Sequence, residues 1–152
     1  MGIFPLFKKK HFFSAHHAKQ IEEAIRMAET KTSGQIRLYV ESKNPYMDPL
    51  ERAKELFLQL NMHQTRHRNA VLMYIAIQHH ELAIFADEGI YKEVGKEFWD
   101  HAVQIMISHF KGGNLVKGIE HCIQHIGDTL KEKFPHNNND TNELSSDIVF
   151  GD

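Results

Sequence analysis

The spacing of apolar residues changes several times along the chain, and each change predicts a new element. After Ser14, a residue type that caps helices, apolar positions recur at helical spacing as far as Ala28, which predicts an amphipathic helix with its end marked by Gly34. From Gln35 to Ser42 apolar and polar residues alternate, which predicts a strand. The apolar face of this strand carries Ile36, Leu38 and Val40.

A second helix and a hairpin follow. Asp48 is a typical cap and Pro49 suits the first helical position, so a helix begins there. The runs 69–77 and 81–87 are almost continuously apolar, as strands covered on both faces tend to be. Because only residues 78–80 separate them, we expect the two strands to form a hairpin.

The last part of the chain predicts two long helices and a tail. One helical stretch runs from Gly89 to Phe110 and ends at Gly112 and Gly113. Asn114 then caps a helix whose apolar stripe reaches Leu130. Residues 135–152 are polar and acidic, which predicts a flexible tail in which residues 148–150 are the part that can dock.

The order helix, strand, helix, strand, strand, helix, helix predicts an α/β fold. We expect a three-layer α/β/α sandwich, Rossmann-like, with a small mixed sheet flanked by helices and its first two strands parallel through a right-handed crossover. The expected organisation is an apolar and basic segment over residues 1–13, one domain over 14–134, and the tail over 135–152.

Composition narrows the class of protein. A chain of 152 residues with 41% apolar residues suits a single domain, expected to be a monomer. A net charge of only −2 gives no field that would attract nucleic acid, so no nucleic-acid partner is expected. Cys122 is the only cysteine, which excludes an intramolecular disulfide. With no secretion signal and no apolar run long enough for a transmembrane segment, we expect a soluble, cytoplasmic protein.

The hairpin brings candidate functional residues together. The start of its first strand lies beside the end of its second, so Arg68 and Asn69 should cluster with Asp87 and Glu88. A guanidinium can grip phosphate bidentately, and two carboxylates suit a hard cation such as Ca²⁺ or Mg²⁺. The alternative is that Asp87, Glu88 and Gly89 form only a turn and a solvated helix start.

Other residues with chemically active side chains are expected to have structural roles. The pairs His63 with His67 and His121 with His125 are four apart, a metal-binding spacing on a helix, but no third ligand accompanies them. Cys122 falls on an apolar stripe, which favours a core role. Trp99 also falls on such a stripe. Neither a GxxxxGK[ST] loop nor a GxGxxG motif is present, so no nucleotide cofactor is expected.

Several segments, taken in order, resemble the TPM domain family, which is linked to phosphate-ester hydrolysis and to roles in protein assembly. The resemblance spans residues 21 to about 130, and the tail motifs Asn142–Ser145 and Phe150–Gly151 are similar to short bacterial members that consist of the domain alone. It implies an α/β/α sandwich with a binding site at the strand ends, sometimes with a divalent cation. The segments that carry it are Thr32–Ile36, Thr65–Leu72, Ala86–Ile90, Trp99 and Phe110–Gly112.

Two functional hypotheses follow from this resemblance. In the first, the chain is a phosphatase-like hydrolase in which Arg68 and Asn69 bind a phosphorylated small molecule, and Asp87 and Glu88 are catalytic and hold a divalent cation. In the second, it is a non-catalytic module that binds a metal ion or a protein partner. Gln35, which stands where the family commonly has an acid, favours the second.

Overall fold

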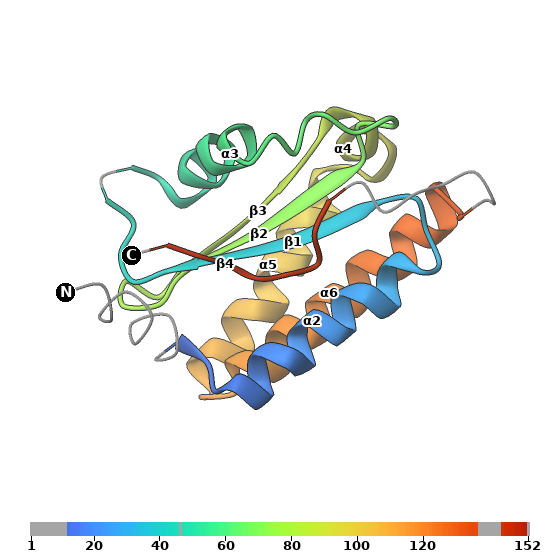
Figure 1. The fold of residues 1–152 in the computed structure, drawn as a ribbon. Coiled ribbons are helices and arrows are strands. Elements are labelled where there is room, and N and C mark those ends of the chain that lie inside the picture. Colours follow the sequence, from blue (N-terminus) through green and yellow to red (C-terminus); the bar gives the residue numbers. More distant parts are fainter. Residues whose placement is uncertain (1–11, 46, 137–143, 152) are drawn as a thin grey trace.

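The sheet has four strands in the order β3-β2-β1-β4, in a computed structural model that describes residues 12–45, 47–136 and 144–151. The parallel pairs are β1 (Gln35–Glu41) with β2 (Ala70–Ala76) and β1 with β4 (Val149–Phe150). The last strand, β3 (Glu81–Ala86), runs antiparallel to β2. As Figure 1 shows, β3 and β4 therefore occupy the two edges of the sheet.

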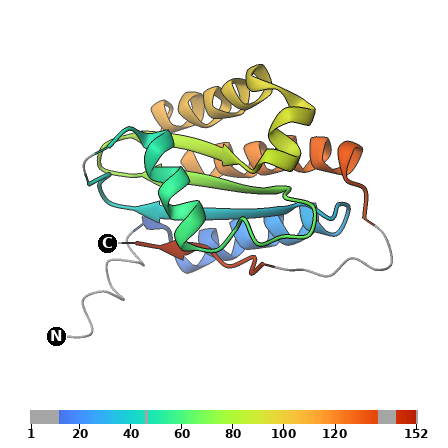
Figure 2. The same cartoon turned by 90° about the horizontal axis from the view of Figure 1, so that it is seen from above.

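Helices cover both faces of this sheet, which confirms the three-layer α/β/α sandwich. One face packs on α2 (Ala15–Glu29), α5 (Lys96–Lys111) and α6 (Leu115–Lys133). The other packs on α3 (Pro49–Gln59). The short α4 (Glu88–Val94) follows β3 directly, and Figure 2 shows α5 beyond the β3 edge of the sheet.

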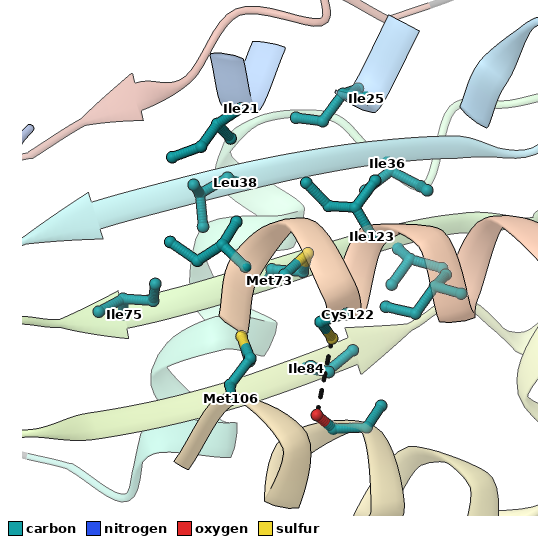
Figure 3. Packing of buried hydrophobic residues seen from close by; sticks show 14 of the residues in the cluster. Ile21, Ile25, Ile36, Leu38, Met73, Ile75, Ile84, Met106, Cys122 and Ile123 are labelled. Carbon is teal, nitrogen blue, oxygen red and sulfur yellow. Dashed lines mark hydrogen bonds between the residues drawn. The ribbon is translucent and has the colours of Figure 1, made fainter. Parts of the chain in front are cut away.

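The larger core lies between the sheet and the three-helix layer. Figure 3 shows side chains of this core, with isoleucines from α2 and β1 on one side and Met106 of α5 and Cys122 of α6 on the other. The Cys122 Sγ lies 3.6 Å from the Ala102 carbonyl oxygen, to which it donates. Burial raises the pKa of the Cys122 thiol to about 12, so the core role expected for this residue agrees with its position.

Most of the predicted elements are present, with one error in the second half. Ser14 accepts a hydrogen bond from the His17 N–H, and Asp48 accepts from two backbone N–H groups of α3, so these two predicted caps form. Asn114 stands at the N-cap position of α6, but its side chain makes no capping hydrogen bond. The single helix predicted after Gly89 is wrong, because the chain breaks between α4 and α5 at Gly95. That residue has a φ of 92°, in the region that favours glycine.

The described part of the tail lies along β1 rather than projecting from the domain. Val149 and Phe150 pair with Tyr39 and Val40 as β4, so the segment expected to dock does so. The Leu144 N–H donates to the Gln35 side-chain oxygen at 3.0 Å. Residues 1–11, 137–143 and 152, on which other expectations for the N-terminal segment and the tail rest, lie outside the described residues. In the ranges that the structure covers, no helix is both long and apolar enough to span a bilayer.

Candidate functional site

A groove of about 900 Å³ follows the β3 edge of the sheet. One wall comes from α3, the other from α4 and α5, and the strand itself forms the floor. Leu50, Leu58 and Tyr91 on these walls are 52%, 50% and 41% exposed, unusually high for large apolar side chains. Volume and apolar lining both fall in the range of ligand-binding clefts.

The floor of this groove presents unpaired backbone groups. The Asp87 N–H donates to the Ala70 carbonyl, so Ala70 and Asp87 are a hydrogen-bonded pair. This contact fixes which residue pairs along β2 and β3 are hydrogen-bonded to each other. Because such pairs alternate with non-bonded ones, the N–H and C=O groups of Leu82, Ile84 and Ala86 point away from β2 into the groove. Within the described residues, none of these groups has a hydrogen-bond partner on that side.

One end of the groove holds the predicted cluster of Arg68, Asp87 and Glu88. The Arg68 Nε and Nη2 lie 2.7 and 2.9 Å from the two Asp87 oxygens, and Nη1 lies 3.0 Å from Glu88 Oε1. Hydrogen bonds to Asp87 raise the pKa of the Arg68 guanidinium. One cation and two carboxylates leave the cluster with a formal charge of −1.

Backbone contacts hold the cluster of Arg68, Asp87 and Glu88 in place. Arg68 has a φ of 51°, a left-handed conformation that few non-glycine residues adopt. Its carbonyl accepts from the Gly89 N–H at 2.8 Å, and a Cβ at Gly89 would lie 2.5 Å from that oxygen and 2.2 Å from the His67 carbonyl oxygen. Asp87 also caps α4 by accepting from the Glu88 N–H. Only glycine at 89 allows this approach.

Asn69, predicted to bind substrate, lies behind the cluster. It is fully buried, and its Nδ2 donates to Ser33 Oγ at 3.2 Å. Its Oδ1 has no partner within the described residues. Gln35, which stands where the family commonly has an acid, is also buried and holds the tail through Leu144. As they stand, neither residue is exposed to a ligand in the groove.

The cation implied by the family resemblance does not fit the donors in this arrangement. Hard cations take six or more oxygen ligands. Both Asp87 oxygens already accept from Arg68, one also accepts from the Glu88 N–H, and Glu88 is paired with the same guanidinium. In the ranges that the structure describes, no three His, Cys, Asp or Glu side chains come together to hold a metal. A cation could bind Asp87 only after Arg68 moved.

Only one of the two histidine pairs lies on a helix, the pair His121 and His125 on α6. His63 and His67 lie in turns rather than on a helix. On α6, His121 and His125 each face a histidine of α5: the ring centroids of His109 and His121 are 5.8 Å apart, and those of His101 and His125 are 5.5 Å apart. Trp99 is 4% exposed and packs edge-on against Phe98, which agrees with a packing role.

The opposite end of the central strands β1 and β2 holds a polar network that the sequence did not reveal. Arg52 of α3 forms two 2.9 Å hydrogen bonds with the buried Glu41, which also accepts from the Tyr74 hydroxyl. Desolvation raises the pKa of Tyr74, and hydrogen bonding to Glu41 raises that of Arg52. Every charge in it is paired inside the protein, so the network has a structural role. The helical spacing of Arg52 gave no sign that it would face Glu41.

The structure described so far is an α/β/α sandwich with a cluster of acidic and basic side chains at the strand ends. The family model of the TPM domain matches residues 6–129. The chain belongs to the TPM domain family.

Two solved structures are similar to this chain. The BA42 protein from the psychrophilic bacterium Bizionia argentinensis, determined by NMR, is 36% identical with a TM-score of 0.86, and the match covers 92% of this chain and 96% of that one. The N-terminal domain of the cg2496 protein from Corynebacterium glutamicum is 12% identical with a TM-score of 0.60. The match covers 90% of this chain and 80% of that one, and it shows a likeness of fold alone. A comparison with curated proteins gives no match.

Proposed function

We propose that this chain is a non-catalytic module that binds a segment of another protein in the groove along β3. The observation that carries the proposal is the groove itself, which combines a mainly apolar lining with a free strand edge. Exposed strand edges bind extended polypeptide by main-chain hydrogen bonds, while flanking pockets select side chains. Small phosphorylated molecules need neither feature.

The cluster at the groove end also favours binding over hydrolysis. The Arg68 guanidinium is committed to two carboxylates, and the net negative charge of the cluster opposes the approach of a phosphate dianion. Asn69, which would orient the substrate, is fully buried. In this proposal Arg68, Asp87 and Gly89 fix the start of α4 and thereby shape one wall of the groove.

The second candidate is a phosphate-ester hydrolase, favoured by one specific observation. Arg68, Asp87 and Glu88 converge on one open groove, as such an enzyme requires. Arg68 would have to exchange its carboxylate partners for phosphoryl oxygens. A divalent cation would then have to take its place beside Asp87.

The two functions are separated by measuring phosphate release from p-nitrophenyl phosphate and from nucleoside di- and triphosphates. The assay is run with Mg²⁺, Ca²⁺, Mn²⁺ or a chelator, and the parent is compared with Asp87→Asn. This change removes the charge but keeps a good cap for α4. We expect no turnover in any condition; metal-dependent turnover that Asp87→Asn abolishes would establish the hydrolase instead.

A further inference from the structure

We infer that the groove takes an extended segment with alternating apolar and acidic residues, which adds to the sheet as a fifth strand beside β3. This inference rests on the proposed function and names the chemistry of the partner. Three features carry it: the unpaired backbone of β3, the helices that flank the strand on both faces, and the two lysines of the groove that have no ion-pair partner within the described residues.

The backbone of β3 supplies the main-chain contacts. Leu82, Ile84 and Ala86 direct six unpaired N–H and C=O groups into the groove. The strand carries no proline and no lysine, residues by which proteins commonly protect an edge from pairing, and its one charged residue, Glu81, stands at its first position. Leu82, Ile84 and Ala86 are only 9%, 5% and 7% exposed, so neighbouring side chains lie close over this edge and have to move aside when a segment pairs with it.

The flanking helices restrict what can reach this edge. Residues of α3 line the groove on one face of the sheet and residues of α4 and α5 line it on the other. A second folded copy that presented its own β3 would bring its own flanking helices into collision with these helices, so pairing between two intact sheets is disfavoured.

Two lysines are the charged groups of the groove that have neither an ion pair nor a side-chain hydrogen bond within the described residues. Arg68 is paired with Asp87 and Glu88, Lys96 is paired with Asp100, and Asp48 accepts from two N–H groups of α3. Two further charged residues line the groove, Lys54 on the α3 wall and Lys92 on the α4 wall. Neither lysine has an ion-pair partner within the described residues. Because successive side chains of a strand point to opposite faces of the sheet, the acidic residues of the segment would complement the lysine of one wall while its apolar residues pack on the other wall.

The experiment measures the fluorescence anisotropy of a labelled peptide in which valine alternates with glutamate. Counterparts with glutamine or lysine in place of glutamate test the charge, and a version N-methylated on the amides of one edge tests strand addition without changing the protein. The protein variants are Lys54→Glu and Lys92→Glu, with Lys19→Glu on α2, away from the groove, as the matched control.

We expect saturable binding of the glutamate peptide, weakened about fivefold or more by the groove variant on the wall that the glutamates face, unchanged by Lys19→Glu and lost on N-methylation. Equal binding of the glutamine or lysine peptide would overturn the acidic preference, and equal binding of the N-methylated peptide would overturn strand addition; both would leave the proposed function standing. No binding of any peptide, together with metal-dependent phosphate release, would overturn the proposed function itself. A dimer that Lys54→Glu dissociates would assign the groove to a second copy and overturn the inference.

Discussion

Glu29 is a buried carboxyl that joins the last turn of α2 to the tail. It is 8% exposed, accepts from the Ile36 N–H at 2.9 Å and accepts from the Ser146 hydroxyl at 2.9 Å. Desolvation is the largest influence and raises its pKa to about 7, while these hydrogen bonds lower it. The protonated form is therefore favoured in the folded protein more than in the unfolded chain.

The first prediction concerns pH and this carboxyl. Between the unfolded pKa of 4.5 and the folded value of about 7, the folded state binds more protons, so stability falls as pH rises through this window and is level above it. The loss from pH 4.5 to 7 is on the order of 3 kcal/mol. Urea unfolding at pH 5 and pH 8 should show Glu29→Gln to be the more stable protein at pH 8, with a smaller difference between the two pH values. An unchanged pH slope in Glu29→Gln would contradict this.

The second prediction concerns the close approach at Gly89. Gly89→Ala places a methyl group 2.2 Å from the His67 carbonyl oxygen, so the backbone must shift, at a cost of roughly 3 kcal/mol or more. Gly112→Ala is the matched control, because its Cβ would lie 3.6 Å or more from its neighbours at an ordinary φ. Thermal unfolding should show a large decrease for the first and a change within about 0.5 kcal/mol for the second. Similar effects of the two changes would mean that position 89 does not depend on glycine.

At the scale of residues, the sequence predicted the cluster but not its internal pairing. Hairpin geometry alone placed Arg68 beside Asp87 and Glu88, and the structure has all three in contact. Whether Arg68 faces a carboxylate or a ligand depends on its positive φ and on the contact of Gly89 with the turn before β2. Those are tertiary features with no local sequence signal.

At the scale of elements, histidine rings of α5 and α6 lie against one another at the interface between the two helices. His125 stacks on Phe98 with ring centroids 4.7 Å apart, and its Nε2 is buried without a partner within the described residues. Desolvation lowers the pKa of His125, the neighbouring His101 and His121 lower it further, and Asp128 raises it. Protonation of this ring therefore works against the packing of the two helices.

The third prediction concerns the effect of pH on this helix interface through His125. A folded pKa below the unfolded value of about 6.5 means that the unfolded chain takes up the proton first, so stability is lost as pH falls from 6.5 toward the folded pKa. His125→Gln should lessen the loss of stability between pH 7 and pH 5, and the exposed His136→Gln should not. Denaturant midpoints at the two pH values measure this. Equal acid sensitivity in the parent and His125→Gln would contradict the assignment.

The sequence located those helices and strands that begin at a capping residue or show strict alternation of apolar and polar residues. Ser14 and Asp48 located two helix starts, and alternation located β1. The break at Gly95 was missed because the apolar spacing continues across it and a lone glycine is tolerated in many helices. Strand order was also beyond local reading, so the sequence did not show that β3 is an edge strand, nor that Lys54 and Tyr91 line a groove beside it.

At the scale of the whole molecule, the two edges of the sheet differ. The β1 edge is covered by the chain's own tail, through β4 and through contacts of Leu144, Ser146 and Ile148 with side chains of β1 and α2. The β3 edge has no such cover within the described residues, although its walls are apolar. The covered edge shows how an extended segment completes this sheet, and the account assigns the same arrangement at the open edge to a partner.

The most direct measurement is amide hydrogen exchange of β3, followed by NMR with and without the peptide that alternates valine and glutamate. The account predicts that the N–H groups of Leu82, Ile84 and Ala86 exchange rapidly in the free protein and become protected on binding, while those of Ala83 and Phe85, already paired with β2, are protected throughout. Protection confined to other parts of the surface, or no change at these three amides at saturating peptide, would contradict the assignment of the β3 edge as the binding site.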